Sequence, residues 1–140
     1  ENMGATLRIA ANIGAEKVIF ISDFAQNFKE NKIFRTASGA AEKINWEITS
    51  QKSLPMNLLD YNIIAIETCP DATNIFEFQF PEKVVFMIGN EINGTSDFLL
   101  SQSQHKIFIP IPGTISSLNV SHALAVAVFE WFRQMTLKFR

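Results

Sequence analysis

Apolar residues along this chain of 140 residues fall into an alternating series of helix-like and strand-like segments. Between Asn2 and Asn12 they recur at the spacing of one helix face, which predicts a short amphipathic helix with Asn2 as its N-cap and Gly14 as its stop. Continuous apolar and β-branched runs predict strands that are covered on both faces, as in a parallel sheet. These runs are residues 17–22, 62–67, 83–88 and 106–110.

Polar and turn-rich segments separate these runs and complete the alternation. Residues 40–44 predict a brief helix, residues 46–48 a short strand and residues 96–103 a further helix. This order favours an α/β fold with a mostly parallel sheet flanked by helices. Because a chain of this length is typical of one compact unit, we expect a single domain over residues 1–140.

The last predicted helix begins at Asn119 or Ser121, runs to about Met135 and is apolar on nearly all sides. It contains a continuous apolar run from Ala123 to Phe129, and further aromatic residues follow that run. A helix that is apolar all round must be buried on every side. The last helix of a small domain rarely achieves this within one subunit, so we expect part of it to pack against a second copy.

Charge and cysteine content narrow the partners and the compartment. Twelve Lys and Arg against fourteen Asp and Glu give a net charge of −2, so a polyanion must be bound locally. The densest cationic stretch holds Lys29, Lys32 and Arg35, which form either a solvated loop or a contact to an RNA backbone. The only cysteine, Cys69, excludes an internal disulfide and suits a reducing compartment, so we expect the cytoplasm.

Several common sites are absent from the sequence. No apolar run is long enough to cross a bilayer, so no membrane association is predicted. Neither a Gly-x-Gly-x-x-Gly fingerprint nor a Gly-x-x-x-x-Gly-Lys-Ser/Thr loop occurs, which argues against a dinucleotide or triphosphate site. The histidines, His105 and His122, lack nearby carboxylates or thiols with metal-ligand spacing, so we expect no bound metal.

Two segments contain polar and glycine residues that a plain scaffold does not need. Segment 2–8 places Arg8 on a small helix rich in Ala, Leu, Ile and Met. The simpler explanation is a surface arginine whose aliphatic part covers apolar residues while its guanidinium stays in water. In segment 89–94 two glycines follow a buried strand, as a sharp turn or a close ligand requires. A turn alone does not explain Glu91 and Asn93 between those glycines.

The third such segment is 109–121, which joins the last strand to the last helix. Two prolines stiffen its start, and Ser117 and Asn119 stand where the helix begins. Helix capping explains either residue alone. The combination of prolines, polar groups and a buried helix also suits a binding loop.

Together the three segments resemble the three motifs of the SpoU (TrmH) family of the SPOUT methyltransferases. Asn2-x-Gly-x-x-x-Arg8 is similar to the first motif, residues 87–94 to the second, and residues 109–113 with 117–121 to the third. They occur in the family's order and span almost the whole chain. Members of the family methylate ribose 2′-hydroxyls in tRNA or rRNA with S-adenosyl-L-methionine, and the resemblance implies that activity and cofactor here.

The resemblance also implies features of the fold that no pattern in the residues predicts. The C-terminal part would thread through a loop to form a deep trefoil knot, an exception to the rule that chains are not knotted. The protein would be a homodimer with the last helix in its interface. The cofactor's adenosine would contact Gly89, Ile109 and Leu118, largely through backbone groups. The chain would begin inside the first motif, and no appended RNA-binding domain is expected within it.

The resemblance assigns roles to five residues. Arg8 would act on the 2′-hydroxyl, Asn2 and Asn119 would hold the substrate or Arg8, and Ser117 and Glu91 would support the pocket. A guanidinium stays protonated and is a poor general base. Our hypothesis is therefore that Arg8 holds the neighbouring phosphate and stabilises negative charge on the attacking oxygen.

Substrate RNA would rest on the cationic stretch of Lys29, Lys32 and Arg35, and its binding would weaken steeply as salt rises. Two other functions are compatible with the sequence. One is a catalytically silent RNA- or nucleotide-binding module on the same scaffold, and the other is an α/β interaction domain without a ligand. No motif identifies the RNA or the nucleotide that is modified.

Overall fold

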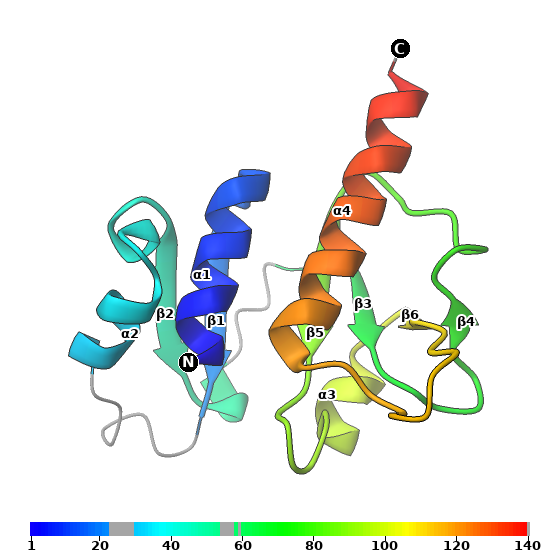
Figure 1. Cartoon of the computed structure of the whole chain (residues 1–140), viewed down its shortest axis with the longest axis horizontal. Helices are drawn as coiled ribbons and strands as arrows, with labels where there is room; N and C mark the ends of the chain where they lie inside the picture. Colours follow the sequence, from blue (N-terminus) through cyan, green and yellow to red (C-terminus); the bar gives the residue numbers. More distant parts are fainter. Residues whose placement is uncertain (23–29, 54–57, 59, 140) are drawn as a thin grey trace. The chain divides into compact units, whose positions relative to one another are not determined.

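The structure is a computed structural model that describes residues 1–22, 30–53, 58 and 60–139. The chain divides into two compact units, residues 1–55 and 56–140 (Figure 1). Each unit has its own parallel sheet and its own apolar core. No helix in the described part of the chain combines the length and the apolar character that crossing a membrane requires.

The first unit contains a two-stranded parallel sheet and two helices. Strand β1 pairs with β2 along their whole length, and Lys17 of β1 forms an ion pair with Glu47 of β2 at 3.0 Å. Single turns of 3-10 helix precede and follow β2. The elements are α1 (Asn2–Ile13), β1 (Lys17–Ile21), α2 (Glu30–Thr36), η2 (Ala40–Glu42), β2 (Asn45–Thr49) and η3 (Gln51–Ser53).

Helix α1 has the amphipathic pattern that the sequence predicts. Leu7 and Ala10 are buried, and Met3 packs against the same core. The helix begins at Asn2 with Glu1 as its N-cap, so the prediction of Asn2 as the cap was wrong by one residue. It ends as predicted at Gly14, whose φ of 71° is the left-handed conformation of a helix C-cap.

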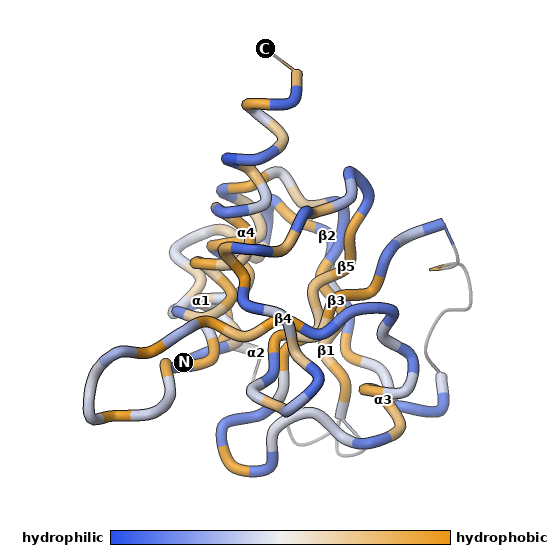
Figure 2. Tube along the Cα trace, turned by 90° about the vertical axis from the view of Figure 1, so that its right-hand side faces the viewer, coloured by the Kyte–Doolittle hydropathy of each residue, from blue (hydrophilic) through white to orange (hydrophobic). Residues whose placement is uncertain are grey.

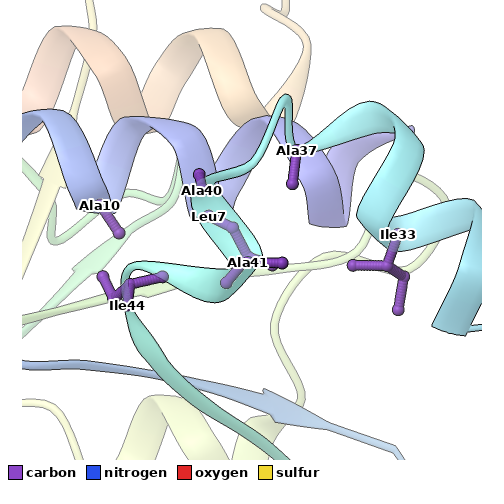
Figure 3. Packing of buried hydrophobic residues seen from close by; sticks show 7 residues of the cluster. All are labelled: Leu7, Ala10, Ile33, Ala37, Ala40, Ala41 and Ile44. Carbon is purple, nitrogen blue, oxygen red and sulfur yellow. The ribbon is translucent and has the colours of Figure 1, made fainter.

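Helix α2 lies within the polar segment before residue 38, where hydropathy alone predicts no helix. Ile33 and Ala37 are buried because they stand four residues apart and so face the same side of this chain segment. Two well-placed apolar residues therefore dock a mostly polar helix. The core they join is shown in Figure 3 and consists of Leu7, Ala10, Ile33, Ala37, Ala40, Ala41 and Ile44.

Gly4 of α1 packs directly against Thr36 at the end of α2. A Cβ at Gly4 would lie 2.6 Å from the Cβ of Thr36 and 2.7 Å from its carbonyl carbon. We expect Gly4→Ala to lower the free energy of unfolding by about 1–3 kcal/mol, although alanine favours a helix by about 1 kcal/mol over glycine. Thermal unfolding measures this loss. Asn12→Ala, at an exposed position of α1, is the control, and an unchanged Tm for Gly4→Ala would refute the close contact.

The second unit contains a four-stranded sheet in the order β4-β6-β3-β5, and all its pairs are parallel, as the continuous apolar runs predict. Strand β4 is a short edge strand inside a turn-rich segment, so the sequence gives no sign of it. The elements are β3 (Asn62–Ile66), β4 (Thr73–Asn74), β5 (Val84–Ile88), α3 (Asp97–Ser101), β6 (His105–Phe108) and α4 (Val120–Lys138).

Helix α4 packs along β5 and β3 through a core that includes Ala127 and Met135 (Figure 1). Gln134 fixes it further, because its Nε2 donates to the carbonyl of Phe78 and its Oε1 accepts the N–H of Phe80, both at 2.9 Å. The indole N–H of Trp131 donates to the carbonyl of Pro81 at 3.1 Å.

Helix α4 is not buried on every side within its own unit, as expected for an all-round apolar helix at the end of a small domain. Phe129 is 48% exposed and Phe132 is 51% exposed, and their rings contact each other edge to face. Apolar and polar residues alternate along the last turns of this helix (Figure 2). Within its own unit, α4 therefore keeps an exposed apolar surface.

Candidate functional site

The carboxyl ends of β5, β3 and β6 lie side by side, because β3 is the central strand of the three. Ile66 at the end of β3 pairs with Ile88 of β5 and with Ile107 of β6. The predicted cofactor residues Gly89 and Ile109 follow β5 and β6 at this level of the sheet. Ligands of open parallel sheets bind beyond the carboxyl ends of the strands. The second unit therefore brings both residues to the edge where a ligand is expected.

The loop after β5 folds back on itself. Asn90 and Gly94 exchange two backbone hydrogen bonds, of 3.0 and 3.2 Å. The side-chain oxygen of Asn90 also accepts the N–H groups of Ile92 and Asn93, at 2.8 and 2.9 Å. Glu91 is consequently held at the exposed tip of a tight turn. The turn accounts for Asn90, but not for the exposed carboxylate of Glu91.

Gly89 packs against the returning arm of this loop. A Cβ at this position would overlap the backbone of Gly94 and Thr95, at 2.8 Å from the Cα of Gly94 and closer still to its carbonyl carbon. Every residue other than glycine would push the arms of the loop apart. The glycine of the second motif is therefore explained by the close approach of backbone to backbone.

The segment between β6 and α4 leaves its backbone polar groups open. In the described chain, residues 110–118 form no hydrogen bond to another backbone group. Ser117 is exposed, and Leu118 is 41% exposed. Asn119 is the N-cap of α4, as helix capping predicts, and its Oδ1 accepts both the N–H and the hydroxyl of Ser121 at 2.9 and 2.7 Å.

These loops fit S-adenosyl-L-methionine in the chemistry of their groups. An adenine ring needs apolar walls and a few backbone donors and acceptors along its edge. Ile109 and Leu118 offer apolar surface, and the open backbone of residues 110–118 offers the polar groups. The cofactor carries no phosphate, so the absence of a phosphate-binding loop from the sequence is consistent with it.

The other predicted residues belong to the first unit. Arg8 is exposed on α1, and Asn2 is half-buried at the first position of that helix. Lys32 and Arg35 are exposed on α2, three residues apart and therefore on one face. Lys29, the third residue of the predicted cationic stretch, lies outside the described residues.

A cluster of titratable groups beside β4 and β6 does not form a reactive centre. Burial, followed by a hydrogen bond to Asp71, raises the pKa of the Cys69 thiol, and a protonated thiol is a poor nucleophile. A hydrogen bond of 2.7 Å from Lys106 lowers the pKa of Asp71. His105 packs against the ring of Phe78. No group of three or more His, Cys, Asp and Glu side chains with metal-binding geometry occurs among the described residues.

One polar contact at the loop after β5 involves a residue that the motifs did not indicate. Glu67 directly follows β3, and its Oε2 accepts the N–H of Thr95 at 3.2 Å. A carboxylate immediately after a buried strand was the available signal in the sequence. It lies between two of the three motifs and belongs to none of them.

Comparison with known proteins relates the chain to enzymes that modify RNA. A model of the SpoU rRNA methylase family matches residues 1–129. The 23S rRNA (guanosine-2′-O-)-methyltransferase RlmB of Salmonella typhi is 30% identical over 137 residues, which cover 96% of this chain and 56% of that protein. RlmB of Yersinia pestis is 31% identical over 140 residues, which cover 98% of this chain and 56% of that protein. The chain thus spans about half the length of these relatives.

Solved structures share the fold. The TrmH/SpoU tRNA modifying enzyme of A. aeolicus superposes with a TM-score of 0.83 and 26% identity, covering 98% of this chain and 70% of that one. AviRb of Streptomyces viridochromogenes, solved with the cofactor AdoMet, superposes with a TM-score of 0.84 at 23% identity. The superposition covers 96% of this chain and 56% of that one. The predicted α/β class with parallel strands and flanking helices is confirmed by these similarities and by the strand pairing, although the described strands pair in two sheets and not in the one sheet that was predicted.

Proposed function

The chain belongs to the SpoU rRNA methylase family, and we propose that it transfers a methyl group from S-adenosyl-L-methionine to a ribose 2′-hydroxyl of tRNA or rRNA. The observation that carries the proposal is the match to the family over residues 1–129. These residues include all three motifs in full. The position of the second and third motifs beyond β5 and β6 supports it. Both units would contribute to one catalytic domain over residues 1–140.

The cofactor supplies a methyl group that the sulfonium already activates, so the chain needs only to align the reactants and exclude water. Gly89, Ile109 and Leu118 would hold the adenosine. The proposal assigns this task chiefly to backbone groups, because Gly89 has no side chain and the backbone of residues 110–118 is open in the described chain.

Arg8 would hold the phosphate next to the target ribose and stabilise negative charge on the attacking oxygen as the hydroxyl proton leaves to water late in the transfer. The C–S bond to the methyl group breaks as the C–O bond forms, and S-adenosylhomocysteine is the leaving group. A planar guanidinium with its forked donors suits this task better than proton abstraction. Asn2 and Asn119 would orient the substrate or Arg8, and Ser117 and Glu91 would support the pocket. Exposure of Arg8, Ser117 and Glu91 is compatible with contact to a large RNA.

The RNA would be bound through local positive charge. Lys32 and Arg35 lie on one exposed face of α2, and Lys29 completes the proposed contact. Release of counterions from the RNA makes such binding weaken as salt rises. Because the activity is exerted on cellular RNA and Cys69 is a free thiol, the proposal retains the cytoplasm as the compartment.

Two features of the assembly are part of the proposal. The exposed aromatic surface of α4, centred on Phe129 and Phe132, would form the interface of a homodimer. The C-terminal segment from residue 109 onward would thread through a loop into the trefoil knot. The resemblance to the family implies the knot, and the likeness of fold to the A. aeolicus enzyme over 98% of this chain is compatible with it.

Calorimetry and methyl transfer together test the proposal. S-Adenosylhomocysteine, the demethylated product, is expected to bind and to raise the Tm. S-Adenosylmethionine with a tritiated methyl group is expected to label bulk RNA. Binding without label in any RNA would instead favour the catalytically silent module. If the folded protein neither binds S-adenosylhomocysteine nor labels RNA, both the methyltransferase and the silent binding module are contradicted.

A further inference from the structure

We propose that Glu67 is a positioning residue whose carboxylate holds the loop after β5 in the shape that receives the adenosine of the cofactor. The inference rests on the proposed function, because it assumes that Gly89 of this loop contacts the cofactor. It adds a residue outside the three motifs to the machinery of the site.

The backbone of Glu67 is fixed by the centre of the sheet. Glu67 directly follows β3, which lies between β5 and β6. Its N–H donates to the carbonyl of Ile107 in β6 at 3.0 Å, so the β-sheet hydrogen bonds continue through this residue. The side chain therefore starts from a rigid point level with the ends of the neighbouring strands. Rigid elements position a functional group more accurately than loops do.

The carboxylate contacts the returning arm of the loop at two adjacent residues. Its Oε2 accepts the N–H of Thr95 at 3.2 Å. The same oxygen lies 3.1 Å from the point that a Cβ on Gly94 would occupy, so the carboxylate packs against the Cα of that glycine. Gly94 has a φ of 66°, which side chains disfavour. A bare backbone at residue 94 and an acceptor at residue 67 thus complement each other.

No side-chain hydrogen bond of Thr95 replaces this interaction. Thr95 is 8% exposed, and in the described part of the chain its hydroxyl has no hydrogen-bond partner. The bond from its N–H to Glu67 therefore ties this arm to the end of β3, in addition to the backbone pair between Asn90 and Gly94 that joins the two arms. Since the other arm begins at Gly89, which packs against Gly94 and Thr95, a displacement of Thr95 would also move Gly89. Glu67 would thus shape the cofactor site without touching the cofactor.

The proposed role requires an acceptor oxygen but does not require a negative charge. The variant Glu67→Gln keeps an acceptor oxygen without the charge, so it separates this role from a direct ionic contact with the cofactor. Glu67→Gln retains an acceptor and is expected to bind S-adenosylhomocysteine as the wild type does. Glu67→Met removes the acceptor at similar volume and is expected to weaken binding about tenfold or more. Glu82→Met removes an exposed carboxylate elsewhere in the unit and serves as the control. Glu67→Ala replaces Glu67→Met if that variant does not fold.

Calorimetry gives the affinities, and hydrogen exchange of the Thr95 amide reports the loop independently of the cofactor. Faster exchange in Glu67→Met, with wild-type exchange in Glu67→Gln and Glu82→Met, is expected. Wild-type affinity in Glu67→Met would overturn the inference, as would an equal loss in Glu67→Gln, which would indicate that the charge itself binds the ligand. Failure of the wild type to bind the cofactor, with the exchange pattern as expected, would refute the proposed function and the cofactor role of Glu67 with it.

Discussion

Replacing Arg8 by alanine is expected to lower the rate of methyl transfer by about 10²–10³-fold while the affinity for S-adenosylhomocysteine stays unchanged. The loss follows from the proposed role, in which the guanidinium stabilises charge that develops on the attacking oxygen only in the transition state. Single-turnover transfer of a labelled methyl group to RNA measures the rate, and calorimetry measures the affinity. Because Arg8 is exposed on α1, the substitution should leave the Tm unchanged.

Two further variants define what Arg8 does. Arg8→Lys retains the charge but loses the forked donors, and it is expected to lose most of the activity because one ammonium does not reproduce paired hydrogen bonds. Arg35→Ala, on the exposed face of α2, is the matched control and is expected to raise KM for RNA with little change in kcat. Nearly full activity in Arg8→Lys would exclude forked hydrogen bonding as its role.

Replacing both Phe129 and Phe132 by aspartate is expected to convert a dimer into a monomer and to abolish most of the activity. These rings are about half exposed and contact each other, so they form an apolar surface that a second copy would cover. Carboxylates at both positions would have to be desolvated in the interface, which is costly for unpaired charges. Sedimentation velocity measures the mass, and methyl transfer measures the activity.

A surface control distinguishes an interface from general solubility. Phe76 is 62% exposed in the same unit but lies outside α4. Phe76→Asp is therefore expected to leave both the mass and the activity as they are in the wild type. A wild-type protein that sediments as a monomer, or a double variant that remains a dimer, would contradict an interface centred on α4.

The elements that depend on local sequence are those that the sequence predicts. Helix α1 follows from the spacing of Leu7 and Ala10, and strands β3, β5 and β6 follow from their continuous apolar runs. Helix α2 did not follow, because Ile33 and Ala37 are the buried apolar residues described in this segment and most of the other residues are polar. Strand β4 did not follow because its pairing with β6 is a long-range contact within a turn-rich segment.

The residues of the candidate site likewise fall into those that the sequence predicted and those that it did not. Motif residues such as Gly89 and Asn119 were identified from the sequence, and the structure explains each by a local contact: a close backbone approach for Gly89 and a helix cap for Asn119. A role for Glu67 was not predicted, because its partner is the N–H of Thr95, far along the chain, and a backbone group leaves no signal in the sequence. The reason for Gly4 was hidden likewise, since it lies in the contact with Thr36.

The chemical position of the transferred methyl group decides whether this chain methylates ribose 2′-hydroxyls. RNA incubated with the protein and S-adenosylmethionine bearing a heavy-isotope methyl group is digested to nucleosides and analysed by mass spectrometry. We expect the heavy methyl group on the ribose, in 2′-O-methylated nucleosides, and we expect it to be absent when Arg8→Ala protein is used. Label on a base, or no label from folded protein that binds the cofactor, would contradict it.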